Sequence, residues 1–334
     1  MKDDSKQYLS TCRSALREIL EEVSCKVQYK VAFVPSFTCH VCVEPFTEAG
    51  YDIFPYPVKQ DLTIDWVKFR ELVVDHQPAV ILMHGYFGFD TLKDAEVEIE
   101  WLKQEGIILI EDLTHGMWGS FAHLNVPYHI GSVRKWFETP DGAFVQGLHR
   151  NLSSCEEDDA LVKAKMKGME AKGDFLAGIS DSPNYRELQL QAEELLDQRR
   201  ETYRMADKSI CILNTYDVNE VMQKRRENYR CLHDALRTFP QLLSVVGDVS
   251  QNETPFQIPV YVREGRKELQ QHMVANKIFP TIIWACPEAL KDKIDEEAQY
   301  IYNHILCFHC DHRYDTSDIN RIISVLQGYY QNKS

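Results

Sequence analysis

Short apolar runs alternate with helical stretches from residue 10 to about residue 150. The apolar runs are 31–35, 51–56, 79–85, 106–112 and 142–147. Each has the length of one strand, and glycine, proline or polar residues flank it. Because nearly every position in these runs is apolar, both faces of their sheet must be buried. The pattern therefore predicts an α/β fold with a mainly parallel sheet covered by helices.

The helical segments are marked by their start and stop signals. Ser10 is the predicted N-cap of a helix with the sequence TCRSALREILEEV, whose apolar residues share one face. Another helix is predicted over 94–104. Residues 156–235 are charged and mainly helical, with predicted breaks at Gly173 and over 180–184.

The pattern changes beyond about residue 240 to shorter strands and helices. The last of them is a helix over 316–327 that begins at Thr316. This end of the chain is typical of a small α/β domain. We therefore expect a large domain over 1–235 and a small C-terminal domain over 236–334.

Composition excludes several classes of protein. The 334 residues include 37 basic and 51 acidic side chains, a net charge of −14, which argues against a nucleic-acid-binding protein. No apolar run approaches the ~20 residues of a membrane helix, and the N-terminal MKDDSKQYLS lacks the apolar core of a secretory signal. Ten scattered cysteines in such a chain are expected to be reduced thiols, so we expect a cytoplasmic location.

Candidate chemistry lies where the predicted strands end, because ligands bind beyond the carboxyl ends of parallel strands. Asp112 ends one apolar run, and Lys135 follows in the segment GSVRKWFETPDG. By itself, each residue is commonly a solvated surface charge. As a pair they match pyridoxal phosphate, which needs a lysine amine for a Schiff base and a carboxylate on its pyridine nitrogen.

Further segments resemble motifs of the DegT/StrS group of fold-type-I aminotransferases, in the same order along the chain. The most specific is Ile110-Glu111-Asp112-Leu113-Thr114-His115, which is similar to the group's Glu-Asp-x-x-(Gln/His). The segment Ser132-Val133-Arg134-Lys135, followed by Pro140-Asp141-Gly142-Ala143, resembles the group's lysine loop. The other matching segments are 12–16, 35–38, 84–88, 202–205, 225–229 and 311–314.

The resemblance implies an aspartate-aminotransferase-like fold with pyridoxal 5'-phosphate as cofactor and Lys135 as its Schiff-base lysine. By the same match, Asp112 pairs with the pyridine nitrogen and His115 lies against the ring oxygen. The remaining implied cofactor contacts are Arg13, Ser14, Ser132, Thr38, Tyr86 and Thr202. The group implies glutamate as amino donor, a nucleotide-linked keto sugar as acceptor, and a homodimer in which cofactor contacts cross between subunits.

Departures from the group's pattern affect the details of the site. Cys39 stands where many relatives have an aromatic residue that stacks on the cofactor ring, which leaves Tyr86 and His115 as stacking candidates. Arg13 replaces a threonine, and its guanidinium is suited to bidentate phosphate binding. Thr202 replaces the asparagine offered across the dimer, and Ser132 lies closer to Lys135 than its counterpart does.

Alternatives remain at this stage. The segments Cys39-His40-Val41-Cys42 and Cys307-Phe308-His309-Cys310 offer zinc ligands, but their separation is far longer than in compact zinc modules. Buried, inert thiols are therefore the preferred interpretation, and no metal is expected. Two alternative functions also remain open: an aminotransferase for a keto substrate without a nucleotide, and a cofactor-binding regulatory homologue without turnover.

Overall fold

The computed structural model describes residues 5–120 and 123–331. The N-terminal residues 1–4, part of the segment read for a secretory signal, lie outside the described residues. Two compact units make up the chain. One contains the residues up to Lys26 together with Tyr128–Tyr216, and the other contains Val27–Pro127 together with the residues from Asp217 onward. We call them the first and the second unit.

The second unit contains the parallel strands that the apolar runs predicted. They are β2 (Val31–Pro35), β3 (Asp52–Tyr56), β4 (Val80–His84) and β5 (Ile108–Asp112). Their order is β5-β4-β2-β3, and all neighbouring pairs are parallel. The prediction of parallel strands over these segments is therefore confirmed, with bounds that differ by at most two residues.

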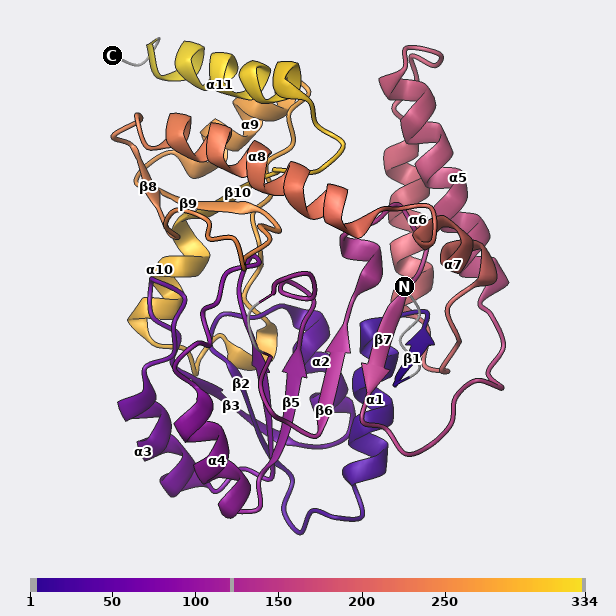
Figure 1. The fold of residues 1–334 in the computed structure, drawn as a ribbon, viewed down its shortest axis with the longest axis vertical. Helices are drawn as coiled ribbons and strands as arrows, with labels where there is room; N and C mark the ends of the chain where they lie inside the picture. Colours follow the sequence, from indigo (N-terminus) through magenta and orange to yellow (C-terminus); the bar gives the residue numbers. More distant parts are fainter. Residues whose placement is uncertain (1–4, 121–122, 332–334) are drawn as a thin grey trace. The chain divides into compact units, whose positions relative to one another are not determined.

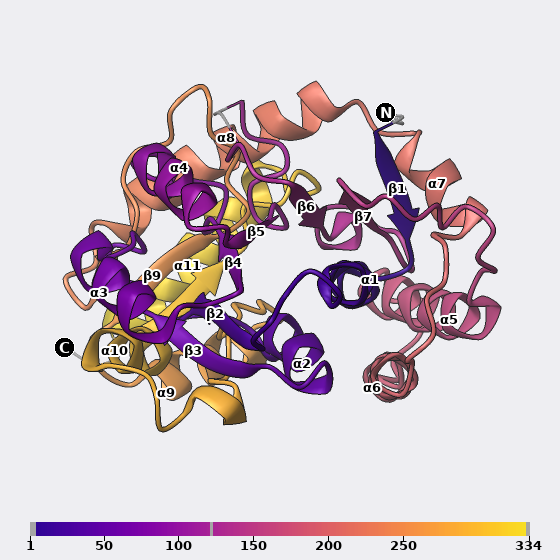
Figure 2. The ribbon, with the colours of Figure 1, turned by 90° about the horizontal axis from the view of Figure 1, so that it is seen from below.

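Helices cover both faces of these strands. They are α2 (His40–Glu48), α3 (Trp66–His76) and α4 (Glu96–Gln104). Figures 1 and 2 show α3 and α4 on one face and α2 on the other. This arrangement buries both faces of the strands, as their continuous apolar character requires.

The C-terminal part of the second unit has its own antiparallel sheet, in the order β10-β9-β8. Its elements are α8 (Val218–Leu236), β8 (Leu242–Ser244), β9 (Ile258–Val262), α9 (Arg266–Ala275), η2 (Glu288–Leu290), α10 (Glu296–His304), β10 (Ile305–Phe308) and α11 (Thr316–Gln331). The last helix begins at Thr316 as predicted and extends four residues beyond 327. The predicted domain boundary at residue 235 falls in the last turn of α8, and the two-domain division remains a prediction.

The first unit combines three antiparallel strands with helices. Its elements are β1 (Lys6–Leu9), α1 (Cys12–Val23), β6 (Tyr128–Gly131), η1 (Val133–Lys135), β7 (Ala143–Gln146), α5 (Asp159–Leu176), α6 (Tyr185–Asp197) and α7 (Asp207–Leu213). The strand order is β1-β7-β6, and both pairings are antiparallel. The short polar strands β1 and β6 carry too little periodicity to be predicted from the sequence. Helices α5 and α6 run side by side as a hairpin (Figures 1 and 2).

Two predicted helix boundaries are wrong. Thr11, not Ser10, caps α1: its hydroxyl accepts a hydrogen bond from the backbone N–H of Ser14 at 3.0 Å. Gly173 does not break α5, which continues to Leu176. Helix α5 packs on α6, where Gly168 lies against Gln189, and the helix ends just before Gly178, whose φ is +70°. The predicted break over 180–184 is confirmed.

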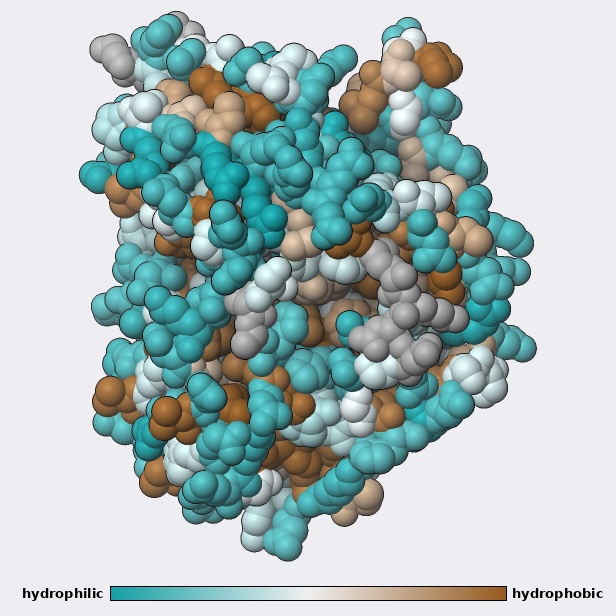
Figure 3. Space-filling model, in the orientation of Figure 1, coloured by the Kyte–Doolittle hydropathy of each residue, from teal (hydrophilic) through white to brown (hydrophobic). Residues whose placement is uncertain are grey.

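The surface in Figure 3 is largely hydrophilic, as the acidic composition requires. Exposed apolar residues lie near the end of the α5–α6 hairpin, where Leu176 and Ile179 are 60% and 76% exposed. Within the described residues, none of the helices combines the length and hydropathy needed to span a membrane.

Gly173 and Gly178 provide a matched pair of substitutions in α5. Among the described residues, no atom lies within 4 Å of the place that a methyl group on either glycine would take, but only Gly178 has a positive φ. We expect Gly173→Ala to stabilise α5 by about 1 kcal/mol, because alanine loses less backbone entropy in a helix. Gly178→Ala should instead destabilise it by about 1 kcal/mol through the left-handed backbone. Amide hydrogen exchange along α5 measures both changes in stability. Equal effects of the two substitutions would contradict the left-handed backbone conformation of Gly178.

Candidate functional site

Asp112 is the last residue of β5 and is buried. Its Oδ1 accepts a hydrogen bond from the backbone N–H of Thr114 at 2.8 Å. The Cys42 thiol lies 3.6 Å from Oδ2. These contacts fix the orientation of the carboxylate beyond the end of its strand, where a ligand of a parallel sheet is expected.

His84 is paired with Asp112 in the register of β4 and β5. Burial lowers the pKa of His84, against the opposing effect of the negative charge of Asp112, so the imidazole is neutral near pH 7. Its Nδ1 lies 3.4 Å from the Gly85 carbonyl oxygen, the geometry of a donor. In that tautomer Nε2 is an acceptor, and it is buried without a hydrogen-bond partner among the described residues.

Thr38 follows β2 and is completely buried. Its backbone is held by Tyr302, whose hydroxyl accepts from the Thr38 N–H and donates to the Thr38 carbonyl, both at 2.9 Å. Its own Oγ1 has no partner within the part of the chain that the structure describes. Buried polar atoms normally have partners, so Thr38 Oγ1 and His84 Nε2 are two groups that a bound ligand would satisfy.

His115 lies in an aromatic cluster. Its ring stacks on Phe256, with centroids 4.5 Å apart, and on Trp284, with centroids 5.4 Å apart. Its Nδ1 accepts a hydrogen bond from the backbone N–H of Phe87 at 3.3 Å. The proton of the neutral ring is therefore on Nε2, which makes Nε2 a donor.

Tyr86 is buried in the same region. Its hydroxyl donates to the Phe37 carbonyl oxygen at 2.6 Å, and its ring stacks on Phe37 with centroids 5.6 Å apart. The rings of Tyr86 and His115 thus already have aromatic neighbours. Stacking of either ring on a cofactor remains a prediction.

The turn after β4 is fixed to the segment 254–256. The Phe256 N–H donates to the Phe87 carbonyl at 2.7 Å. Gly88 has φ +85°, and a methyl group on it would lie 1.8 Å from the Thr254 carbonyl oxygen. Glycine is therefore required at this position, and the contact keeps Phe256 beside His115.

A buried ion pair supports the same segment. Arg225 donates to Asp311 Oδ2 at 2.9 Å and to the Phe256 carbonyl at 3.1 Å. Burial by itself would raise the pKa of Asp311, but the hydrogen bond from Arg313 and the charge of Arg225 hold that pKa well below its usual range. The carboxylate therefore stays ionised and anchors Arg225, which positions Phe256 through its carbonyl.

Lys135 lies in the first unit, at the end of the short helix η1. Its side chain is exposed, and its backbone N–H contacts the Ser132 carbonyl at 3.4 Å. Ser132 is buried.

Burial alone would raise the pKa of Glu193, yet the charges of Arg134, Lys165 and Lys135 lower it. Glu193 therefore carries its negative charge within electrostatic reach of Lys135.

Backbone hydrogen bonds join the lysine loop, the start of α1 and the 202–205 segment. The Gly142 N–H donates to the Ser10 carbonyl at 2.8 Å, and the Ser10 N–H donates to the Tyr203 carbonyl at 2.9 Å. The Met205 N–H donates to the Tyr8 carbonyl at 3.1 Å. Three segments distant in sequence therefore meet within the first unit. Cofactor binding by Ser14, Ser132 and Thr202 of these segments remains a prediction.

Arg13 and Ser14 lie in the first turn of α1. The Ser14 hydroxyl is 2.9 Å from that of Thr11. Arg13 is buried, and its guanidinium forms an ion pair with Asp197 at 2.9 Å, whose side chain is 65% exposed. The cavity beside them measures only about 10 Å³, room for one water molecule. Asp197 therefore already engages one end of the guanidinium, and phosphate binding by Arg13 remains a prediction.

Asp141 anchors the lysine loop to α7. Its carboxylate accepts a hydrogen bond from the Ala206 N–H at 3.1 Å and another from the Ser209 hydroxyl. Burial raises the pKa of Asp141 to about 6, although both hydrogen bonds oppose the shift. The loop that carries Lys135 is therefore held by a carboxyl group that titrates near neutral pH.

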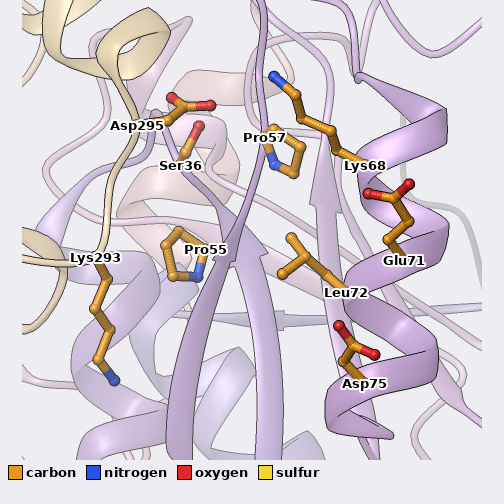
Figure 4. Close-up of a pocket in the computed structure, with 9 residues that line it drawn as sticks. All are labelled: Ser36, Pro55, Pro57, Lys68, Glu71, Leu72, Asp75, Lys293 and Asp295. Atoms are coloured by element: carbon orange, nitrogen blue, oxygen red, sulfur yellow. The ribbon is translucent and has the colours of Figure 1, made fainter.

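A larger cavity of about 330 Å³ lies between α3 and the end of β3. Figure 4 shows Lys68, Glu71, Leu72 and Asp75 on α3, opposite Pro55 and Lys293. Neither the predicted site residues nor His84 line it. It is a separate surface feature of the second unit.

The cysteine pairs differ from each other. Cys307 and Cys310 are buried, as predicted. Cys39 and Cys42 are half-buried instead, because they lie in the first turn of α2 and not within a strand. In the described residues, neither pair belongs to a group of three potential metal ligands; His233, Asp234 and Asp248 form such a group, with both carboxylates exposed.

Several residues beside the predicted site could not be recognised from the sequence. Cys42 contacts Asp112, and Phe256 and Trp284 stack on His115. Each lies more than 65 residues from its partner, and no local motif marks it. The one local signal was the Cys-x-x-Cys spacing of Cys42, which pointed to metal chemistry.

Solved structures of aminotransferases share this fold. A DegT/DnrJ/EryC1/StrS aminotransferase from Brucella abortus has a TM-score of 0.65 at 15% identity, covering 97% of this chain and 85% of that one. PseC from Helicobacter pylori, an aminotransferase involved in the biosynthesis of pseudoaminic acid, has a TM-score of 0.67 at 14% identity, with coverages of 98% and 87%. The Streptococcus pneumoniae putative sugar aminotransferase Spr1654 in its PMP form has a TM-score of 0.68 at 14% identity, with coverages of 98% and 88%.

No protein-family model and no curated protein sequence matches the chain. The structural likeness confirms the predicted aspartate-aminotransferase-like fold, of the kind found in DegT/StrS aminotransferases. At these identities it shows the fold alone.

Gly88→Ala tests the close contact beside His115. We expect it to lower the free energy of unfolding by about 3 kcal/mol or more, because a methyl group would collide with the Thr254 carbonyl at a positive φ. Gly85→Ala is the control in the same turn, since its methyl group would meet atoms only at 3.6 Å and beyond. Urea unfolding of both variants measures the difference, and equal stabilities would contradict the packing described.

Asp141→Asn tests the titration of the buried carboxyl. Because the folded pKa of about 6 lies above the ordinary value of 3.8, the stability from Asp141 is full below pH 4 and is lost as pH rises through 6. We expect the asparagine variant to exceed the wild type in stability by about 2–3 kcal/mol at pH 7.5 and to match it at pH 4. Urea unfolding across this range measures it, with the exposed Asp159→Asn as control. A constant difference between wild type and variant would contradict the assigned pKa.

Proposed function

We propose that this chain is a pyridoxal-phosphate-dependent aminotransferase of the DegT/StrS type. The proposal rests on the pair Asp112 and Lys135. Asp112 is the buried last residue of β5, and Lys135 lies in the loop between β6 and β7. The fold is one that aminotransferases of known structure share. A buried carboxylate after a strand together with a lysine in this order is the set of groups that the cofactor needs.

The residues of the second unit fit the pyridine side of the cofactor. Asp112 offers a buried, oriented carboxylate for the ring nitrogen. His115 offers its Nε2–H to the ring oxygen, as the tautomer fixed by Phe87 allows. Thr38 Oγ1 has no partner among the described residues, so it is suited to take part in ligand binding. Tyr86 would contribute by contact, since its hydroxyl is already bonded.

The residues of the first unit fit the phosphate and the amine. We assign the phosphate to the start of α1, with Arg13 and Ser14, and to the buried Ser132. A helix N-terminus provides oriented N–H groups and a favourable field for an anion. Thr202 lies in the segment tied to Ser10 and is assigned to the cofactor of the partner subunit in a homodimer.

When bound, the cofactor supplies an electrophilic aldehyde and an electron-accepting ring. Lys135 carries the cofactor and, once released, moves the proton of the donor's α-carbon with its Nζ. Asp112 keeps the pyridine nitrogen protonated, which favours loss of that α-proton. His115 would donate its Nε2–H to the ring oxygen and so orient the ring. Each residue thus has one task at one stated atom.

We assign glutamate as the amino donor and a nucleotide-linked keto sugar as the acceptor, in the synthesis of polysaccharide or glycan precursors. The support is the sugar aminotransferases among the structural neighbours and the matched sequence motifs. The proposed setting is cytoplasmic, where nucleotide-linked sugars are made. A homodimer follows from the assignment of Thr202.

Lys135→Ala tests the proposal. With pyridoxal phosphate, the wild type should show a visible absorbance band that glutamate bleaches, and borohydride should fix the cofactor to the 128–216 segment. Lys135→Ala should lose both the covalent attachment and the bleaching, because it removes the amine that we assign to both. Spectra and peptide mass mapping provide the measurements.

Lys163→Ala is the control, since Lys163 is an exposed lysine of the same unit, with 81% of its side chain accessible. A wild type that binds no cofactor, or a Lys135→Ala variant that borohydride still labels, would refute the site. A cofactor band that glutamate leaves unchanged would favour another donor or the regulatory alternative.

A further inference from the structure

The thiols of Cys39 and Cys42 lie together at the start of α2. Cys39 is the N-cap residue and Cys42 lies in the first turn, with their sulfur atoms 3.5 Å apart. Residues three apart in a helical turn are neighbours, and a disulfide needs the sulfurs to approach to about 2.05 Å. Side-chain rotation alone can close that gap, because both residues occupy one short turn.

Access favours reaction at this pair, and electrostatics favour attack by Cys39, because the Asp112 carboxylate beside Cys42 opposes a thiolate there. Both side chains are partly exposed to solvent. The N-terminus of a helix carries partial positive charge, which stabilises a thiolate, the reactive form of cysteine. Between the two cysteines, His40 and Val41 are exposed, so a small reagent can approach the turn.

The second Cys-x-x-Cys segment provides an internal contrast. Cys307 and Cys310 are completely buried in and after β10. Burial raises the pKa of Cys310 to about 12 and that of Cys307 well above its usual range. Neither forms a thiolate near neutral pH, so the same spacing in this part of the chain is unreactive.

The reactive pair also contacts the candidate site. Cys42 Sγ is 3.6 Å from Asp112 Oδ2, so the reduced thiol donates a hydrogen bond to that carboxylate. A sulfur committed to a disulfide has no proton to donate. Asp112 would then keep its bond from the Thr114 N–H and lose the one from Cys42.

We propose that Cys39 and Cys42 form a reversible intramolecular disulfide that responds to small disulfides and withdraws a hydrogen bond from Asp112. The oxidant is a low-molecular-weight disulfide. One thiolate attacks it, forms a mixed disulfide and releases one small thiol; the other thiolate then displaces the second small thiol. Two protein thiols are oxidised, one small disulfide is reduced to two thiols, and atoms and electrons balance.

Oxidation of the pair does not depend on the proposed function. The effect on turnover does, because it acts through the role of Asp112. The disulfide should slow the glutamate half-reaction about fivefold, the factor expected for loss of one hydrogen bond. Reduction should restore the rate.

The first experiment measures the disulfide directly. The full chain is equilibrated with mixtures of reduced and oxidised glutathione, alkylated under denaturing conditions and digested with trypsin. Residues 31–59 form one peptide that contains both cysteines, and residues 294–313 contain the other pair. Under oxidising mixtures we expect the first peptide to escape alkylation and to weigh two daltons less than its unmodified dithiol form. The second peptide should stay fully alkylated. Full alkylation of the first peptide in every mixture would overturn the proposal.

The second experiment tests the link to Asp112 with matched variants. Cys39→Ser keeps the Cys42 thiol as donor to Asp112 but cannot form the disulfide, so it should bleach with glutamate at the reduced wild-type rate in every mixture. Cys42→Ala should be about fivefold slower and equally insensitive to glutathione. If the wild type forms the disulfide while its rate stays unchanged, the link to Asp112 is wrong. If the wild type binds no cofactor, the proposed function fails, and the peptide masses still decide the disulfide.

Discussion

The register of the parallel strands in the second unit is the constraint on which the candidate site depends. It places His84 of β4 opposite Asp112 of β5, and β2 beside β4. Parallel strands deliver their carboxyl ends to one edge, so the residues that follow them gather there. A slip of one residue would turn every side chain to the opposite face. The continuous apolar core on both faces therefore determines where the polar groups lie.

The polar groups at this edge fall into satisfied and unsatisfied ones. Asp112 is oriented by the Thr114 N–H and the Cys42 thiol. In the described residues, Thr38 Oγ1 and His84 Nε2 have no partner. A buried polar atom without a partner destabilises the folded chain by about 1–3 kcal/mol. Rigid supports next to unsatisfied groups are the arrangement expected where a polar ligand binds.

In the first unit, backbone hydrogen bonds provide the supports beside the predicted site residues. The start of α1, the lysine loop and the 202–205 segment are joined through Ser10, Gly142 and Tyr203. Asp141 adds the connection to α7 through Ala206 and Ser209. Lys135 itself remains exposed, on a loop whose neighbours are fixed. A nucleophile on a well-supported loop combines access to a ligand with a defined position.

The sequence by itself determined the parallel strands and the residues that end them, and it singled out Asp112 and Lys135 as the proposed pair, because apolar continuity and motif order are local properties. It did not determine β1 and β6, whose few residues carry no clear period, nor the continuation of α5 through Gly173 to Leu176. Only the tertiary structure brought Cys42 to Asp112 and Phe256 and Trp284 to His115. Such contacts join residues far apart in the chain, and the folded backbone alone sets the distances between them.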